Sequence, residues 1–356
     1  MSRQLNLTIA LAILAAAANG YAFTWQMCGG TKVKWPTGSV TMRASAVGFP
    51  AGSTWRSALD ATRTRFNQSP ANMRYLMLFD DPSIGMGNGQ SEVWWSSGFG
   101  APAITYTWWN GSCQLVEADI IFDNTVAYTT STTKTSLIPY GGPYRPFQTT
   151  AMHELGHGQG LGHTADRYSI MGQDWTHIHS NGSTANAYPG GDAIAGSVST
   201  YGIIGGAYED LGIAHWRRTG ASGEYSIHQR TRVLNTSGVE LAKIISGGQP
   251  VYLVNKGQTV KLEMTYENMG KTSPITSGVN YYVSTNDTIS AADTFLGAGS
   301  VTLYRGTATT SNTTLVIPNN LVSGTTYYLG GTIDPTGAYV EYSESNNATY
   351  VGIKIN

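Results

Sequence analysis

Charged residues are scarce in this chain: Asp, Glu, Lys and Arg together make up 12% of its 356 residues. The formal net charge is −1, and no segment is strongly basic. Proteins that bind nucleic acids or anionic membrane surfaces do so through clusters of basic side chains. We therefore expect neither nucleic acid nor an anionic membrane surface among the partners of this protein.

Long hydrophobic runs are also lacking, except near the N-terminus, where residues 7–18 are almost entirely apolar. A run of this length is too short to cross a bilayer as a helix. Arg3 precedes it and small residues follow it, which is the pattern of a secretory signal peptide. We predict a signal peptide over residues 1–22 and a secreted, extracellular mature protein with no membrane span. A membrane anchor is the alternative.

Cysteine is almost absent, with only Cys28 and Cys113. An even number of cysteines in an exported chain favours a disulfide, which we predict between these two residues. The alternative is that Cys28, close to the predicted mature N-terminus, coordinates a metal ion as a thiolate and keeps an enzyme latent. The sequence alone leaves both interpretations open.

Histidine is rare as well, but three of the seven histidines lie in the sequence HELGHGQGLGH, from His153 to His163. On a helix, His153 and His157 lie one turn apart and project from the same face, so both can reach one metal ion. Gly160 and Gly162 can adopt positive φ angles that end the helix and turn the chain. The turn brings His163 to the same ion. Three protein ligands leave the fourth position of a tetrahedral Zn²⁺ open, which is the arrangement of a catalytic site.

Glu154 directly follows the first of these histidines, where its carboxylate can act as a general base toward a water activated by the metal. Residues 169–172 (Ser-Ile-Met-Gly) follow the third histidine closely. The pattern H-E-x-x-H-x-x-G-x-x-H, followed by such a Met-turn, is the zinc signature of the metzincin peptidases. We expect Met171 to form an apolar floor beneath the ligands.

The hydrophobic pattern divides the chain into two domains. Residues 23–202 are expected to form an α+β domain with a mixed sheet and the helix that carries the zinc ligands. Its other expected elements are strands at 32–46, 75–79 (buried) and 115–123 (half-buried), a loop at 80–100, and helices that begin at Ser53 and Asp192. Residues 203–223 have the composition of a connector. Residues 224–356 contain short alternating strands separated by Gly, Asn, Asp and Pro, typical of an antiparallel β-sandwich.

The N-terminal domain resembles the matrixin branch of the metzincins. Besides the zinc motif and the Met-turn, the resemblance rests on residues 117–122 (Glu-Ala-Asp-Ile-Ile-Phe) and 192–202. The first segment is similar to the family's edge strand above the cleft, and the second to its closing helix. The resemblance implies a zincin-like (metzincin) catalytic domain with one catalytic Zn²⁺. We expect the strand that ends at Asp123 to be the edge to which an extended substrate adds, and residues 172–189 to form the wall of the pocket beside the zinc.

The C-terminal domain is similar to the CARDB family of extracellular β-sandwich adhesion modules, on residues 284–293 and 340–347. This resemblance implies an Ig-like sandwich with a surface or a polysaccharide as its target. Asp287 and Asp293 could hold Ca²⁺, although aspartates that form turns explain both residues as well.

These observations together predict a zinc-dependent endopeptidase that hydrolyses peptide bonds of extracellular proteins, with extended polypeptides as substrates. An adhesion or polysaccharide-binding protein on a catalytically idle metzincin scaffold is the alternative, and another zinc hydrolase, such as an amidase, is a third hypothesis. In the adhesion hypothesis, sugars would stack on tryptophans, namely Trp94, Trp95, Trp108 and Trp109; apolar packing is the alternative role for most of them. The intact Glu154 argues against an idle scaffold, which has no need of a base. We expect His177 and His179 to have surface or structural roles, and Glu209 and Asp210 to be solvated.

Overall fold

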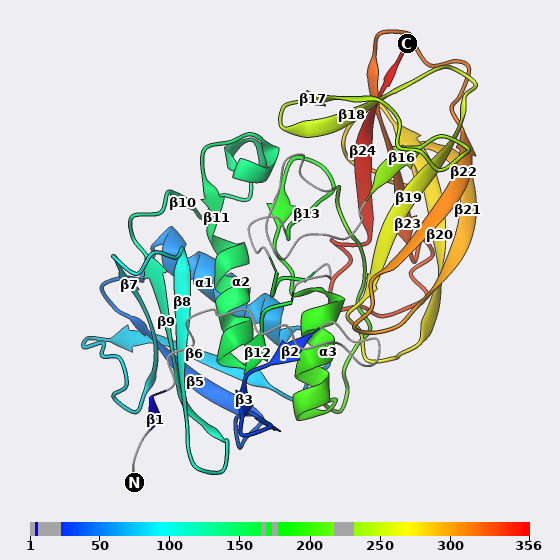
Figure 1. The fold of residues 1–356 in the computed structure, drawn as a ribbon. Coiled ribbons are helices and arrows are strands. Elements are labelled where there is room, and N and C mark those ends of the chain that lie inside the picture. Colours follow the sequence, from blue (N-terminus) through cyan, green and yellow to red (C-terminus); the bar gives the residue numbers. More distant parts are fainter. Residues whose placement is uncertain (1–3, 6–22, 165–168, 173–176, 217–230) are drawn as a thin grey trace.

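The computed structural model describes residues 4–5, 23–164, 169–172, 177–216 and 231–356. In these residues the chain forms two units that lie side by side, an N-terminal unit with helices and a mixed sheet and a C-terminal β-sandwich (Figure 1). The predicted signal peptide falls almost wholly outside the described residues. None of the helices in the described part of the chain is long and apolar enough to cross a membrane.

The N-terminal unit is built on a six-stranded sheet with the strand order β1-β8-β9-β7-β5-β6. These strands are β1 (Gln4–Leu5), β5 (Ser39–Ser45), β6 (Arg74–Asp81), β7 (Ser91–Ser96), β8 (Ala103–Trp109) and β9 (Leu115–Asp123). Strands β6, β5, β7 and β9 pair in parallel, whereas β8 is antiparallel to β9. The sheet is therefore mixed, as expected for this α+β domain.

Strand β9 is an inner strand, so the prediction that it forms the edge is wrong. It lies between β7 and β8, and β8 forms the edge of the sheet along residues 103–107, because the two-residue β1 pairs only with Trp108 and Trp109. The predicted burial is wrong as well, because Glu117 and Asp119 are fully buried while Val116 is 43% exposed. The loop between β6 and β7 covers the two acids: the amide of Gly89 donates to Glu117 Oε2 at 2.9 Å, and that of Gly87 to Asp119 Oδ2 at 3.1 Å.

Two further expectations about the sheet need correction. The stretch 80–100 is not all loop, because β7 lies within it and has Val93 fully buried. Strand β6 was expected to be buried, but it is the opposite edge of the sheet. Its Tyr75 is fully buried, whereas Leu76 and Leu78 are 53% and 40% exposed.

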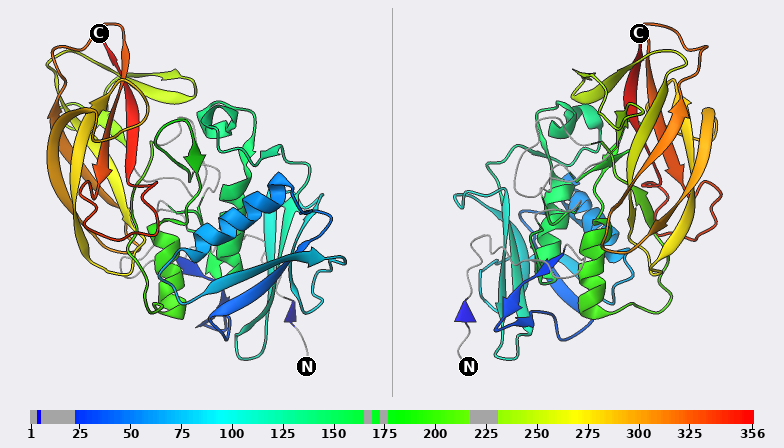
Figure 2. Two further views of the ribbon diagram at one scale, coloured as in Figure 1. Left: turned by 180° about the vertical axis from the view of Figure 1, so that it is seen from behind. Right: turned by 45° about the vertical axis from the view of Figure 1, so that its right-hand side comes forward.

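Three helices occur in the described residues: α1 (Thr54–Asn67), α2 (Phe147–Gly158) and α3 (Gly190–Tyr201). Helix α1 begins after the predicted cap Ser53, whose hydroxyl accepts a hydrogen bond from the amide of Arg56 at 3.1 Å. It packs beside α2 against the sheet (Figure 2). Helix α3 begins at Gly190 after the N-cap residue Pro189, so Asp192 lies in its first turn and is not its cap.

Several short elements connect these parts. They are β2 (Thr24–Trp25), β3 (Met27–Cys28), β4 (Thr31–Lys32), β10 (Tyr128–Thr129), β11 (Arg145–Pro146), β12 (Leu161–Gly162), β13 (His179–Ser180), β14 (Ala185–Asn186), and the 3₁₀ turns η1 (Lys134–Ser136) and η2 (Ile138–Tyr140).

The predicted disulfide is present in the structure. Cys28 of β3 and Cys113, in the turn between β8 and β9, are bonded, with their Cα atoms 5.6 Å apart. The bond ties the N-terminal hairpin to the sheet. Because its sulfur is in the disulfide, Cys28 offers no thiolate to a metal ion, and the structure favours the disulfide over the alternative of a latent, cysteine-bound metal.

Aromatic packing joins the sheet to α2. Trp95 of β7 stacks on Phe147 at the start of α2, with ring centroids 5.6 Å apart, and Phe147 also lies 4.8 Å from Phe122 of β9. Trp94 and Trp108 are only 7% and 4% exposed. These tryptophans therefore serve packing, and the two buried ones offer no surface on which a sugar could stack.

The C-terminal unit is a sandwich of two sheets. In one sheet, β15 and β16 pair with different parts of β19, and β22 pairs with the opposite edge of β19. The second sheet has the order β17-β18-β24-β23-β20-β21. The strands are β15 (Leu211–Ile213), β16 (Arg232–Leu234), β17 (Lys243–Ser246), β18 (Gln249–Val254), β19 (Thr259–Asn268), β20 (Ile275–Ser284), β21 (Thr294–Leu303), β22 (Thr309–Val316), β23 (Thr326–Ile333) and β24 (Ala348–Ile355). All pairs are antiparallel except β18 with β24.

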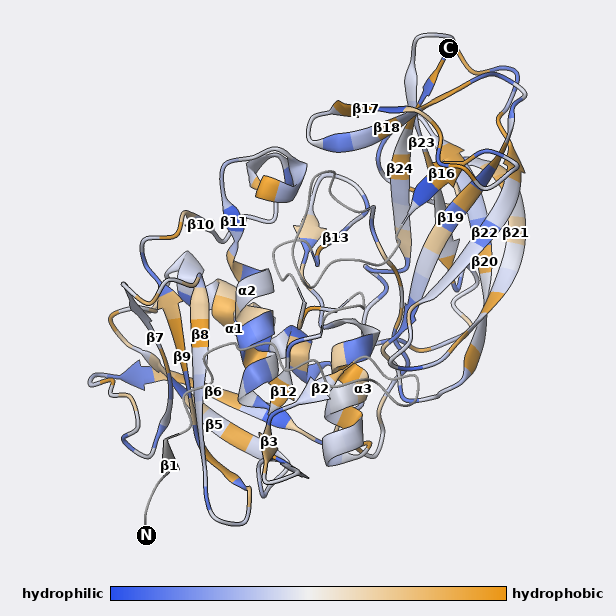
Figure 3. Ribbon diagram, in the orientation of Figure 1, coloured by the Kyte–Doolittle hydropathy of each residue, from blue (hydrophilic) through white to orange (hydrophobic). Residues whose placement is uncertain are grey.

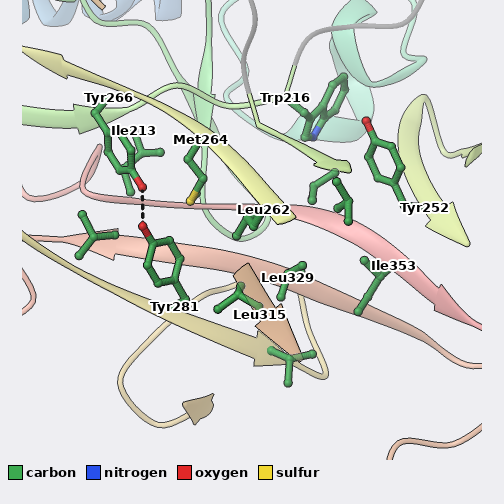
Figure 4. Packing of buried hydrophobic residues seen from close by; sticks show 14 of the residues in the cluster. Ile213, Trp216, Tyr252, Leu262, Met264, Tyr266, Tyr281, Leu315, Leu329 and Ile353 are labelled. Carbon is green, nitrogen blue, oxygen red and sulfur yellow. Dashed lines mark hydrogen bonds between the residues drawn. The ribbon is translucent and has the colours of Figure 1, made fainter. Parts of the chain in front are cut away.

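Hydrophobic side chains fill the space between the two sheets of the sandwich. The strands carry alternating hydrophobic and hydrophilic residues (Figure 3), and most of the hydrophobic ones belong to the buried core cluster. Figure 4 shows Leu262, Met264 and Tyr266 of β19 facing residues of the second sheet. The hydroxyls of Tyr266 and Tyr281 form a buried hydrogen bond of 3.1 Å across this core. The predicted period-2 alternation thus corresponds to a real core face.

The sandwich begins earlier than predicted. Strand β15 lies within residues 203–223, the expected connector, and pairs with β19. Glu209 and Asp210 were expected to be solvated, but they are only 6% and 5% exposed. Glu209 accepts hydrogen bonds from the amide and hydroxyl of Thr272, and Asp210 Oδ1 accepts one of 2.8 Å from the side chain of Asn346. Both acids are buried because the second unit packs over them.

The two units are joined by direct hydrogen bonds along residues 180–182. The side-chain amide of Asn181 donates to the carbonyl of Ile289 at 3.0 Å and accepts from its amide at 2.7 Å. Thr349 donates its hydroxyl to the carbonyl of Ser180 at 2.9 Å. Lys134 forms a salt bridge with Asp287 of the sandwich. The segment that follows the Met-turn is therefore attached to the sandwich.

Candidate metal centre

The three histidines of the motif converge on one point. The distances between their Nε2 atoms are 3.0 Å for His153 and His157, 3.1 Å for His157 and His163, and 3.2 Å for His153 and His163. Tetrahedral Zn²⁺ with Zn–N bonds of about 2.05 Å requires ligand nitrogens about 3.3 Å apart. Among the described residues, this is the one group of three or more His, Cys, Asp or Glu side chains placed to hold a metal ion.

Backbone carbonyls orient two of the rings. Nδ1 of His153 lies 2.7 Å from the carbonyl oxygen of Ile170, and Nδ1 of His157 lies 2.9 Å from that of Leu161. A carbonyl can only accept, so each Nδ1 carries the proton and each Nε2 directs its lone pair to the common centre. Burial, followed by repulsion from the other two imidazoles, holds the pKa of His157 well below its usual value. His157 is thus in the neutral form that binds a metal.

The end of α2 brings the third histidine into place. Gly160 has φ +91°, and a Cβ there would lie 2.4 Å from the carbonyl oxygen of Val33, so the position requires glycine. The predicted turn at Gly160 is present. Gly162 does not have a positive φ; it lies in β12, where a Cβ would approach the hydroxyl of Thr24 to 2.4 Å. Gly162 is therefore needed for close packing, and Gly160 alone turns the chain.

The Met-turn lies against the same helix. Met171 is 1% exposed, and its Sδ is so close to Gly156 that a Cβ on Gly156 would lie 2.2 Å from it. Gly156 precedes the ligand His157 directly. The amide of Thr164, next to the third ligand, donates to the carbonyl of Met171 at 3.1 Å. These contacts fit an apolar support beneath the ligands.

Glu154 projects from α2 toward the edge strand β8. Its side chain is 4% exposed, and its Oε2 accepts a hydrogen bond of 2.6 Å from the hydroxyl of Thr105. Thr105 was not singled out in the sequence, because it lies 49 residues from its partner and belongs to no motif.

His177 and His179 are not part of the metal group. They are 1% and 2% exposed and lie against the ring of Tyr188, with centroid distances of 4.8 and 5.9 Å. Burial lowers the pKa of His179 to about 4, so it is neutral. Of the two roles that were expected, the structure supports the structural one, because neither side chain reaches the surface.

Asp287 and Asp293 both have protein partners, which favours the interpretation that they stabilise turns and salt bridges. Asp287 pairs with Lys134, and Asp293 Oδ2 accepts from the amide of Ser290 at 2.8 Å, as an aspartate in a turn does.

A group of buried carboxylates lies in the N-terminal unit, beneath the loop between β6 and β7. There Asp81 is 4% exposed and Glu92 is fully buried, and each has one oxygen, Oδ2 and Oε1, without a hydrogen-bond partner.

Burial is the main cause that raises the pKa values of Glu92 and of Asp119, which lies beneath the same loop. The pKa of Glu92 is raised to about 7 and that of Asp119 to about 8. Charged carboxylates so close together in a buried position require either protons or a cation.

The matrixin family model matches residues 107–187, which include the end of β8, all of β9, the zinc motif and the Met-turn. No curated protein has a significant match to the chain. The solved structures with similarity include a crystal structure of a CARDB domain from Pyrococcus furiosus, in complex with two metal ions, at 13% identity and a TM-score of 0.26. It covers 42% of this chain and 90% of that one. A solution structure of the same domain has 14% identity and a TM-score of 0.25, and the match covers 42% of this chain and 95% of that one.

The chain therefore contains a matrixin-like domain of the metallopeptidase type, centred on the three histidines. The match covers 81 residues of the 356 (187 − 107 + 1).

Proposed function

We propose that this protein is a secreted zinc-dependent endopeptidase of the metzincin type, with residues 23–202 as its catalytic domain. The observation that carries the proposal is the convergence of the three Nε2 atoms within 3.2 Å of one another, with His153 and His157 oriented by backbone carbonyls. His153, His157 and His163 would hold the zinc. Bound Zn²⁺ would act as a Lewis acid that acidifies a water molecule and polarises the scissile carbonyl.

Glu154 is the general base of the proposed reaction. Its carboxylate accepts a proton from the attacking water and returns it to the amine of the leaving product. The side chain is 4% exposed, so bulk water competes little for the carboxylate. Such a position is consistent with a proton carrier between water and substrate.

The edge strand β8 provides the substrate-binding edge in this proposal. The short strand β1 pairs only with Trp108 and Trp109, so residues 103–107 have no partner strand on that side among the described residues. An extended polypeptide can add there by main-chain hydrogen bonds. Thr105 in this stretch contacts Glu154, so a substrate paired with β8 passes beside the base. Residues 172–189, of which 173–176 lie outside the described residues, would form the wall of the adjoining pocket.

The disulfide is consistent with secretion, because such bonds persist in oxidising compartments. The signal peptide over residues 1–22 remains a prediction, as does a surface or polysaccharide target of the sandwich.

The decisive experiment combines zinc analysis with digestion of mixed proteins. We expect the purified protein to bind one Zn²⁺ and to cleave casein, and a chelator to abolish cleavage until zinc is restored. Glu154→Gln should keep zinc but lose activity by about 10²- to 10⁴-fold, the usual contribution of a general base. Asp80→Asn, on an exposed side chain, is the matched control. Equal casein cleavage by Glu154→Gln and wild type would refute the proposal.

The adhesion alternative is not favoured by the structure, because Trp94 and Trp108 are buried. A digest of mixed proteins distinguishes an endopeptidase from an amidase. An endopeptidase releases internal peptide fragments, whereas an amidase releases none.

A further inference from the structure

We propose that Thr105 is a positioning residue for Glu154, which holds the carboxylate of the base in its working orientation. This inference rests on the proposed peptidase function. It assigns a role to a side chain that lies outside the zinc motif and the Met-turn.

The contact between the two side chains is short and buried. Thr105 Oγ1 lies 2.6 Å from Glu154 Oε2 and 3.2 Å from the main-chain oxygen of the same residue. The side chains are 8% and 4% exposed. A hydroxyl has one proton and an ionised carboxylate can only accept, so the shorter contact is a hydrogen bond from Thr105 to the carboxylate. Its length is that of a charge-assisted O–H···O⁻ bond.

Glu154 needs such a partner because of its position on α2. It follows His153 by one residue and so projects about 100° away from the ligand around the helix. A glutamate side chain has three rotatable torsions, and fixing them costs conformational entropy. A hydrogen bond from a neighbouring rigid group restricts the carboxylate to one orientation. Thr105 suits this task, because its β-branched side chain is stiff at χ1 and lies on a strand of the sheet.

Helix α1 provides a matched control, away from the metal centre and from β8. Thr62 of this helix is 2% exposed, and its hydroxyl donates to the carbonyl of Ala58 at 2.8 Å. A threonine-to-valine change at either position removes one buried hydroxyl, but only the change at 105 removes a partner of Glu154.

The test compares Thr105→Val, Thr105→Ser and Thr62→Val in the full-length protein, with casein and a quenched peptide as substrates. We expect Thr105→Val to lower kcat by about 10-fold or more, the usual effect of losing a hydrogen bond to a charged group, with KM changed less than about twofold. Thr105→Ser, which keeps the hydroxyl, should recover most of kcat. Thr62→Val should leave kcat unchanged. Zinc content should be equal in all three variants, and Thr105→Val and Thr62→Val should lower the melting temperature by similar amounts, because each loses one buried hydroxyl.

A double variant separates positioning from other roles. In a Glu154→Gln background, Thr105→Val should cause no further loss of the residual rate, because the group it positions is already gone. A kcat for Thr105→Val within about twofold of wild type would overturn the inference, and so would an equal loss in Thr62→Val. If Thr105→Val fails to fold, a low kcat in the folded Thr105→Ser variant would overturn it instead. If the wild-type protein binds no zinc or cleaves no protein, the peptidase proposal itself is refuted. If the wild type is active and Thr105→Val is equally active, only the role of Thr105 is refuted.

Discussion

The side-chain amide of Asn181 forms hydrogen bonds that attach the segment after the Met-turn to the sandwich. It pairs with both main-chain groups of Ile289, by hydrogen bonds of 3.0 and 2.7 Å. Asn181→Ala leaves the amide and carbonyl of Ile289 without these partners. An unsatisfied buried polar group costs about 1–3 kcal/mol. Since Asn181 is only partly buried, water can replace part of the loss, and we expect a destabilisation of about 2 kcal/mol.

The matched variant is Asn181→Asp, which keeps the oxygen that accepts from the Ile289 amide and loses the donor to its carbonyl. Urea unfolding of the two variants and the wild type, followed by tryptophan fluorescence, measures the change in the free energy of unfolding. We expect Asn181→Asp to lose less stability than Asn181→Ala. A loss below about 0.5 kcal/mol for Asn181→Ala, the level of an ordinary surface substitution, would refute the reasoning.

Three further predictions concern stability. Burial raises the pKa of Asp210 to about 7 and that of Glu341 to about 8. The folded protein therefore keeps protons that the unfolded chain has lost, and the stability they contribute is complete below about pH 4 and is lost as the pH rises toward 7 and 8. Thermal melts from pH 4 to 9 should show this decline, and a shallower one in Asp210→Asn. At pH 8, Glu92→Gln should raise the melting temperature, because burial raises the pKa of Glu92 to about 7 and its ionisation above that pH costs stability; an unchanged melting temperature at pH 8 would contradict this reasoning. Reduction of the bond between Cys28 and Cys113, 85 residues apart, should cost about 4.5 kcal/mol by the loop-entropy model; an unchanged urea midpoint in dithiothreitol would contradict it.

The zinc motif could be predicted from the sequence because its parts are local. Helical periodicity alone places His153 and His157 on one face, and a glycine at position 160 turns the chain toward His163. No tertiary information is required for this step. The structure brings the three Nε2 atoms to the spacing that the motif implies.

Burial could not be predicted where a distant segment decides it. The alternation in β9 was interpreted as one polar and one apolar face, but the loop between β6 and β7 covers Glu117 and Asp119 with amide donors. Asp210 looked solvated because nothing near it in sequence reveals that Asn346 lies against it. Thr105 escaped notice for the same reason. Period and motif describe a segment and its neighbours in sequence, whereas these contacts depend on how separate segments pack.

The pairing of β15 with β19 has a consequence for how the two units could work together. The chain leaves α3 at Tyr201 and already joins the sandwich sheet at Leu211, and Arg65 of α1 donates to Ser345 of the sandwich at 3.0 Å. If the sandwich were joined by a long flexible linker, the proposed catalytic domain could reach a wide range of positions around a ligand bound to the sandwich. Here the contacts fix the sandwich relative to the metal centre, so a ligand bound to the sandwich would lie at a constant distance from that centre. Cuts in an anchored substrate would then fall at a set distance from the anchor.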